Sequence, residues 1–234
     1  MKEINPIIKS LKGKVIISCQ ALKHEIMYGS QYMQKFAESA DKGGACGIRA
    51  NSVVDIKAIK EVTKLPILGI IKQDYENSEC YITPTMAEVD ALYNDAKPEI
   101  IAVDATCRMH PEGQNGADFI RDIKKKYPDA LIMADISTYE EGVEAAKAGA
   151  DIVSTTLSGY TSYTEKTDGP DFELMKKLSE SLDIPVIGEG RVWTREEAVE
   201  AFKTGIYSLV VGTAITRPYD IAKRFCDYVA ENVK

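Results

Sequence analysis

Short, continuously apolar runs recur along the chain, separated by amphipathic segments. The spacing averages about 28 residues, close to the roughly 30 residues of a strand–helix–strand unit. Runs that are apolar at every position are typical of parallel strands covered on both faces. The pattern therefore predicts eight parallel strands alternating with helices, which begin near Val15, Ala45, Ile67, Ile100, Ala130, Asp151, Pro185 and Ser208.

The amphipathic segments carry helix-boundary signals. Residues 138–148 and 194–204 each open with Thr followed three positions later by Glu, which is the pattern of a capping box. Residues 30–42 open with Ser30, a candidate N-cap. The three helices end in the pairs Lys42-Gly43, Ala148-Gly149 and Thr204-Gly205, where we expect the glycine to form a left-handed C-cap directly before a strand. This recurrence indicates repeated units.

The first strand leads into Cys19-Gln20-Ala21-Leu22, without the glycine-rich turn that an open dinucleotide-binding sheet usually carries. The pair Gly188 and Gly190 is spaced for that fingerprint, but Trp193 occupies the third glycine position. The sequence thus predicts a single (β/α)8 TIM barrel over residues 1–234, with 1–13 as a short N-terminal extension and a long final helix over 219–233.

Composition narrows the function. The net charge of −7 argues against nucleic-acid binding, and no apolar run approaches the roughly 20 residues of a membrane span. Five scattered cysteines without a CxxC pair indicate reduced thiols in a cytoplasmic protein. With only two histidines, we expect no metal site.

Polar side chains stand where the predicted strands end. Barrel enzymes place their chemistry at these carboxyl ends. Any one of them has the alternative of simply meeting water, but the set favours a site. Its members are Gln20, Arg49, Lys72, Asp104, Asp135, Thr155 with Thr156, Glu189, and the Gly212-Thr213 turn.

Lys72 is the sharpest candidate because it directly follows the apolar run 67–71. Partial desolvation there favours a neutral amine able to accept a proton from carbon, although a lysine reaching out to solvent is the alternative. Glu189, between two glycines, either pairs with Lys72 across the barrel mouth or is a turn residue. Asp135 either binds substrate hydroxyls or caps the next helix.

The turn after the last strand has the character of an anion site. Small residues from Gly212 onward open a short helix, and Arg217 adds a cation. Barrel phosphates are frequently held by the loops after strands seven and eight, although an ordinary strand-to-helix turn is the alternative. We therefore expect phosphate contacts from Gly190, Arg191, Gly212, Thr213 and Arg217.

These stretches resemble the bacterial NanE-type N-acetylmannosamine-6-phosphate 2-epimerases. The likeness runs in order from about residue 14 to the C-terminus, except that the family often has two glycines at the positions of Gly212 and Thr213. The segments that carry it are Ser18 to Leu22, Gly47 to Ala50, Gly69 to Lys72, Tyr81 to Thr85, Asp104 to Thr106, Met133 to Thr138, Ser154 to Tyr163, Glu189 to Arg191 and Ala214 to Pro218.

The resemblance implies an isomerase of amino-sugar and sialic-acid breakdown that interconverts N-acetylmannosamine-6-phosphate and N-acetylglucosamine-6-phosphate without a cofactor. It implies catalysis by Lys72 with Glu189, and a phosphate held by Arg217 and the strand-eight loop. Sugar contacts are implied for Gln20, Arg49 and Asp135, and we add Thr155 to them.

Two other functions fit the same strand-end residues. A Schiff-base lyase or aldolase also uses a strand-end lysine and a phosphate loop. A non-catalytic barrel could bind the phosphosugar without turnover. The long final helix makes a homodimer a further hypothesis.

Overall fold

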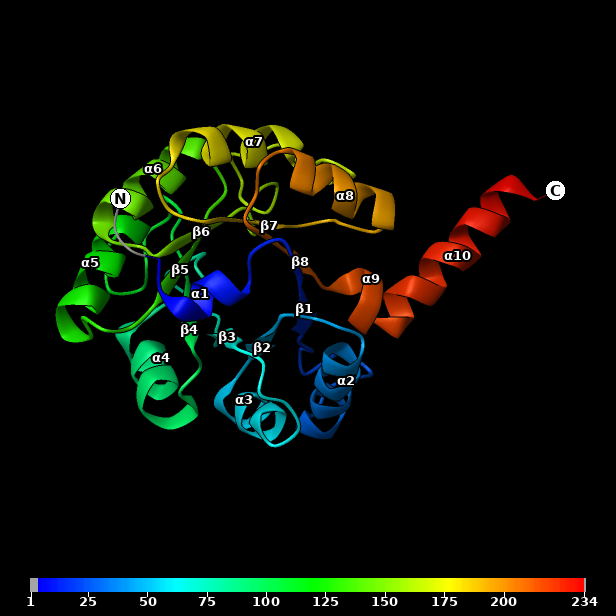
Figure 1. Cartoon of the computed structure of the whole chain (residues 1–234), viewed down its shortest axis with the longest axis horizontal. Helices are drawn as coiled ribbons and strands as arrows, with labels where there is room; N and C mark the ends of the chain where they lie inside the picture. The colour runs from blue at the N-terminus through cyan, green and yellow to red at the C-terminus, as the bar shows by residue number, and fades with distance from the viewer. Residues whose placement is uncertain (1–3, 234) are drawn as a thin grey trace.

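The chain forms a closed barrel of eight parallel strands, in which each strand pairs with its neighbour in sequence and β8 pairs with β1 (Figure 1). The computed structural model describes residues 4–233. The predicted TIM barrel is confirmed, and every strand starts within two residues of its expected position. The strands are β1 (Val15–Cys19), β2 (Gly47–Asn51), β3 (Ile67–Ile70), β4 (Ile100–Asp104), β5 (Ile132–Asp135), β6 (Ile152–Ser154), β7 (Val186–Glu189) and β8 (Ser208–Val211).

Helices follow the strands and surround the barrel. They are α1 (Pro6–Ser10), α2 (Ser30–Lys42), α3 (Val53–Lys60), α4 (Met86–Ala91) continued by the π-helical turn η1 (Leu92–Ala96), α5 (Gly116–Lys126), α6 (Tyr139–Ala148), α7 (Phe172–Ser181), α8 (Arg195–Lys203), α9 (Thr213–Thr216) and α10 (Pro218–Asn232). Within residues 4–233, no helix combines the length and the apolar content needed to cross a membrane.

The predicted boundaries of α6 and α8 are confirmed at both ends. Thr138 and Thr194 each form a complete capping box with the glutamate three residues later. Gly149 and Gly205 adopt the expected left-handed conformation, with φ of 105° and 92°. Both devices satisfy backbone groups that a helix end leaves without partners.

Two boundary predictions for α2 were wrong by one residue. The N-cap is Gly29 rather than Ser30, whose hydroxyl instead donates to Asp55. At the other end Gly43 remains right-handed with φ of −78°, and Gly44 takes the left-handed conformation with φ of 91°. A pair of glycines offers two equivalent places for the turn, so sequence alone did not choose between them.

Two apolar layers hold the barrel together. One fills the space between strands and helices, and the other fills the barrel interior with residues from alternate strand positions. Along β3, for example, Leu68 and Ile70 belong to the interior layer and Ile67 to the outer one. Alternation of this kind decides which residues at the strand ends face the barrel axis.

The N-terminal stretch closes the end of the barrel where the strands begin. Ile8 and Leu11 are buried and belong to the interior layer, and Gly13 donates its N–H to the Tyr207 carbonyl. Residues 4–13 of the proposed extension therefore pack against the barrel, while residues 1–3 lie outside the described part. The opposite end, where the strands finish, stays open for a site.

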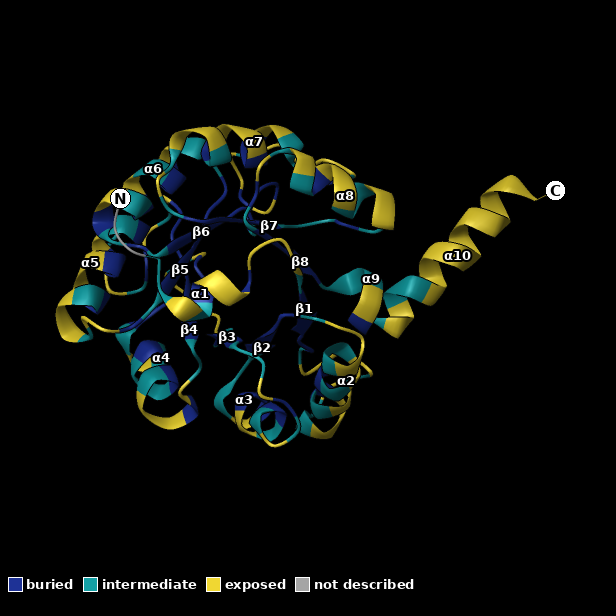
Figure 2. Cartoon of the chain, viewed as in Figure 1, coloured by how far each residue is buried: buried dark blue, intermediate teal, exposed yellow. Residues whose placement is uncertain are grey.

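The final helix α10 projects away from the barrel (Figure 1). None of its described residues is buried, and its ribbon is exposed over most of its length (Figure 2). Phe225 is 71% exposed and Tyr228 68% exposed. Large apolar side chains exposed on one helix are typical of a surface that contacts another protein.

Candidate functional site

A cavity of 390 Å³ opens at the carboxyl ends of the strands. The alternation that points every second residue into the barrel brings two ionisable side chains to this end: Leu68 and Ile70 of β3 are followed by Lys72 just past the strand, and Ile187 of β7 by Glu189 at its last position. Nine of the eleven predicted site residues meet at this cavity. They are Gln20, Arg49, Lys72, Glu189, Gly190, Arg191, Gly212, Thr213 and Arg217.

The Lys72 side chain provides an amine without a partner. Its backbone N–H donates to Asn51, but within residues 4–233 its Nζ makes no hydrogen bond or ion pair. Burial, joined by the cations of Arg49 and Arg217, lowers the pKa of Lys72 to about 8 against the opposing effect of Glu189 and Glu25. About a tenth of this amine is therefore neutral at pH 7, compared with well under a thousandth for an ordinary lysine, and the neutral form can accept a proton.

We expect the pH dependence of kcat/KM to follow this amine. A base must be neutral to act, so kcat/KM should rise about tenfold per pH unit below the pKa and level off above about 8. In Arg217→Gln one cation that lowers the Lys72 pKa is lost, so the limb should move to higher pH. Steady-state kinetics across pH tests this, and an unmoved or lowered limb would contradict the assignment of that limb to Lys72.

Arg49 lies at the centre of a buried charge cluster. Its side chain is 1% exposed. Its Nη1 and Nη2 donate to Oδ1 and Oδ2 of Asp135, at 3.1 and 2.5 Å. Its Nη1 also lies 3.1 Å from Oε2 of Glu189. Burial raises the pKa of Glu189, and the guanidinium of Arg49 opposes that rise. The cluster therefore places one cation between two carboxylates.

Asp135 is beneath the cavity rather than on its lining. Its side chain is fully buried, and its oxygens accept from Arg49 and Thr156. The helix-cap alternative also fails, because the N-cap of α6 is Thr138. Since its lone pairs are used within the protein, Asp135 orients Arg49 instead of reaching a ligand directly.

Gln20 carries an unused acceptor on the cavity lining. Its Nε2 donates to the Ser18 hydroxyl at 2.9 Å, while its buried Oε1 has no hydrogen-bond partner among the described residues. A buried acceptor without a partner costs about 1–3 kcal/mol. An N–H or O–H donor on a ligand would satisfy it, in agreement with the predicted sugar contact.

Thr156, and not Thr155, lines the cavity. The Thr155 hydroxyl is occupied by the backbone of Glu189, donating to its carbonyl at 2.9 Å and accepting from its N–H at 3.0 Å. The alternation along the strand explains this correction, because Ile152 belongs to the interior layer and Thr156 lies an even number of residues after it, whereas Thr155 alternates with Val153 of the outer layer. The period of two was present in the sequence and identifies Thr156 once the strand is placed.

The turn after β7 contributes backbone more than side chain. Gly190 and Arg191 both have positive φ, at 115° and 54°. The Arg191 guanidinium donates to the carbonyls of Ser158 and Gly169, at 2.7 and 3.0 Å, and so ties down the loop after β6. The Arg191 guanidinium is therefore occupied within the protein, which leaves its main-chain N–H as the group that could make the predicted anion contact.

The turn after β8 faces the same cavity. Thr213 begins α9 directly after Gly212, and the first N–H groups of a helix have no partner within it. Arg217 lies at the end of α9 and forms an ion pair with Glu25 at 3.0 Å. N–H groups and a cation on one wall form a place for a small anion.

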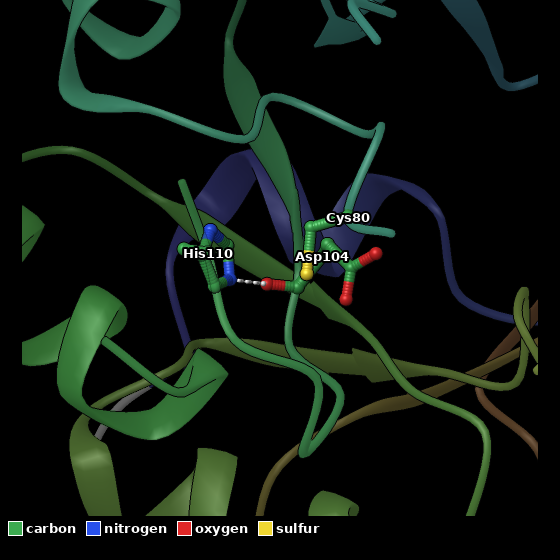
Figure 3. Close-up of side chains that lie close together, drawn as sticks. All are labelled: Cys80, Asp104 and His110. Carbon is green, nitrogen blue, oxygen red and sulfur yellow. Dashed lines mark hydrogen bonds between the residues drawn. The ribbon is translucent and has the colours of Figure 1, made fainter. Parts of the chain in front are cut away.

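A second polar cluster lies outside the cavity lining. Cys80, Asp104 and His110 are buried close together (Figure 3). The two ring nitrogens of His110 lie 2.8 Å from the Pro84 carbonyl and 3.0 Å from the Asp104 carbonyl, and the Asp104 carboxylate pairs with Arg108. Burial raises the pKa of the Cys80 thiol to about 12. These atoms are committed to holding the loop after β4, so the cluster has the character of packing rather than of ligation.

Comparison with known proteins agrees with the site. The profile of the NanE family, described as "Putative N-acetylmannosamine-6-phosphate epimerase", matches residues 33–231. Proteins named "Putative N-acetylmannosamine-6-phosphate 2-epimerase" from Caldanaerobacter subterraneus and Clostridium perfringens are 50% and 54% identical. The first match covers 96% of this chain and 94% of the relative, and the second covers 93% and 97%.

Solved structures give the same answer. The N-acetylmannosamine-6-phosphate 2-epimerase of Clostridium perfringens superposes with a TM-score of 0.91 at 51% identity, covering 97% of this chain and 98% of that one. A thiamine phosphate pyrophosphorylase of Pyrococcus furiosus, at 19% identity and a TM-score of 0.60, shares the barrel alone. On the extent and identity of these matches, the chain belongs to the NanE family of N-acetylmannosamine-6-phosphate epimerases.

Proposed function

We propose that this protein is an isomerase that interconverts N-acetylmannosamine-6-phosphate and N-acetylglucosamine-6-phosphate by moving one proton at C2. The observation that carries the proposal is the desolvated, partnerless amine of Lys72 in a cavity that also holds a carboxyl group and an anion-binding turn. Membership in the NanE family supports the identity of the substrate.

The chemistry requires little beyond these groups. In the open-chain sugar the C2 proton lies next to the C1 carbonyl, so its removal gives an enolate. Lys72 exchanges the proton, and Arg49 and Gln20, which line the same cavity, support the C1 oxygen and the acetamido group. Glu189 serves as the partner of Lys72 and as the acid or base at the ring oxygen.

The phosphate has a separate place on the lining. The main-chain N–H groups of Gly190, Arg191 and Thr213 and the cation of Arg217 supply donors without a buried counter-charge apart from Glu25. Binding the phosphate there orients C2 toward the amine of Lys72, since both lie on one cavity.

The experiment is a proton NMR time course of the purified protein with N-acetylmannosamine-6-phosphate in D2O. We expect N-acetylglucosamine-6-phosphate to appear with deuterium at C2. Borohydride added with substrate should trap no covalent adduct, whereas a Schiff-base lyase would be trapped. Ligand binding without turnover or exchange by folded protein would favour the non-catalytic barrel and overturn the proposal.

We further propose a homodimer formed through α10. A groove of 650 Å³ lies between β1, α2 and α9. In the general (β/α)8 fold, the helix that follows the eighth strand packs at this place on the outside of the barrel. Its lining is largely apolar and includes Val15, Ile17 and Phe36. The α10 of the same chain projects away from it, so the α10 of a second copy is the occupant we infer (Figure 1). Reciprocal insertion uses both grooves and both helices.

Replacing Phe225 with aspartate should therefore weaken the dimer by at least about 100-fold, since two buried aromatic side chains are lost per dimer. Light scattering coupled to size-exclusion chromatography measures the mass across concentration. Lys223→Gln on the same helix is the matched control, because Lys223 pairs only with Asp227 of its own helix among described residues. A wild-type monomer, or an unaffected Phe225→Asp dimer, would refute this interface.

We also propose that the protein works in the cytoplasm. Its five cysteines are free thiols, and Cys107 and Cys226 are exposed. Exposed thiols of this kind persist in reducing compartments. A phosphorylated sugar substrate agrees with the same location.

A further inference from the structure

The hydroxyl of Thr156 lies between the two carboxyl groups of the site. Its Oγ1 is 2.6 Å from Oδ1 of Asp135 and 3.1 Å from Oε2 of Glu189. The Ser154 hydroxyl lies 2.9 Å away and can donate or accept. Thr156 thus links Asp135 at the end of β5 to Glu189 at the end of β7.

The two carboxyl groups are unequally supplied with donors. Asp135 accepts from both terminal nitrogens of Arg49 and from Thr156. The hydrogens of Arg49 Nη1 are directed at Asp135 and at the sulfur of Met133, so the 3.1 Å approach of Nη1 to Oε2 of Glu189 has no aligned hydrogen. Among the described residues, the Glu189 carboxyl group has one hydrogen-bond partner, Thr156.

A hydroxyl has only one proton to donate. The shorter contact assigns the Thr156 proton to Asp135, which leaves a lone pair of Thr156 facing Oε2 of Glu189. If Glu189 were ionised, two acceptors would face each other in a buried site, which is unfavourable. If Oε2 carries a proton, the contact becomes a hydrogen bond.

We propose that Thr156 is a positioning residue that holds Glu189 in its protonated form, through a relay in which Glu189 donates to Thr156 and Thr156 donates to Asp135. The inference rests on the proposed function, because it states which carboxyl group of the same site carries a proton. The proton stays on Glu189, where it is available to the ring oxygen, and Asp135 stays ionised beside Arg49.

This arrangement separates the roles of the two titrating groups. With Glu189 neutral, Lys72 loses an opposing negative charge that would favour its protonated form. The amine is then more readily the free base that the reaction needs. Within residues 4–233, the charged and titratable groups around the relay are Arg49 from β2, Lys72 and Tyr81 after β3, Asp135 from β5, Glu189 from β7, Glu25 from the loop after β1, and Arg217 after α9.

Infrared titration of the free enzyme in D2O tests the relay directly. A protonated carboxyl group gives its own carbonyl band, which is assigned to Glu189 by its absence from Glu189→Gln. In Thr156→Val the neutral acid loses its acceptor, so the titration of this band should move to lower pH by about one unit. Thr156→Ser keeps a hydroxyl and should restore the wild-type position.

The opposite geometry predicts the opposite shift. If Thr156 donated to an ionised Glu189, Thr156→Val would move the titration to higher pH, and that result would overturn the relay. Absence of a Glu189 band in the folded wild-type enzyme would do the same. The infrared result does not depend on turnover, so it remains interpretable if epimerisation itself is not found.

Kinetics add a second readout. At its pH optimum, Thr156→Val should lose at least about tenfold in kcat, because less of Glu189 carries the proton that the reaction needs. KM should change less than about threefold, because the phosphate contacts are unaltered. Thr156→Ser should recover most of kcat. An equal loss of kcat in both variants would indicate a packing role for the residue and contradict the relay.

Discussion

Lys72→Ala is expected to lower kcat/KM for N-acetylmannosamine-6-phosphate by about 10²–10⁴-fold and to stop exchange of the C2 proton in D2O. The amine is partnerless and desolvated on the cavity lining, and no other described lysine lies there. Because the amine stabilises nothing through a hydrogen bond or ion pair, the variant should remain folded. Proton NMR measures the exchange, and circular dichroism verifies the fold.

Two further lysine variants sharpen this result. Lys147→Ala removes an exposed lysine of α6 that pairs with Glu144 and should leave turnover unchanged. Lys72→Arg keeps the positive charge but cannot supply a neutral base, so it should be as inactive as Lys72→Ala. Turnover near that of the wild type in either Lys72 variant would remove this residue from the mechanism.

The second large effect concerns Arg49. Arg49→Met should destabilise the fold by about 3–5 kcal/mol, because the fully buried Asp135 carboxylate is then left without its cation. Chemical denaturation measures the free energy of unfolding. Arg121→Met is the matched control, since the Arg121 pair with Asp118 is half exposed and its loss should cost less than about 1 kcal/mol.

The destabilisation of Arg49→Met should depend on pH. Arg49 lowers the Glu189 pKa, so its removal raises that pKa above the already elevated value in the folded state. The folded state then binds more protons than the unfolded state, and stability falls as pH rises through the folded pKa. Equal stability losses at acid and alkaline pH would show that the carboxyl groups are not the origin of the effect.

Much of the barrel could be predicted from local sequence. Apolar runs set the strands, and the two Thr–Glu capping boxes set the starts of α6 and α8, because these signals act over a few residues. Lys72 and Glu189 were also identifiable, since each directly follows an interior run and parallel strands end on one rim of the barrel.

The connections between those residues were decided only by the tertiary structure. Arg49 and Asp135 are 86 positions apart, and no local pattern states that their side chains meet. The position of Asp135 beneath the lining, and the use of the Arg191 guanidinium to tie down the loop after β6, depend on such distant contacts. Choosing Thr156 rather than Thr155 as the cavity-lining residue required knowing which positions of the three-residue strand β6 face the barrel interior. A shift of one residue reverses that assignment.

The final helix also shows which properties follow from local sequence and which depend on the tertiary structure. Its amphipathic sequence determined that a helix would form over about 219–233, and α10 spans Pro218–Asn232. Its direction depends on the short α9 and on the turn at Arg217 and Pro218, not on its own pattern. Local periodicity determined the elements and the rim on which the chemistry lies. The closing of the barrel decided which side chains meet there, because burial and charge pairing depend on contacts between distant parts of the chain.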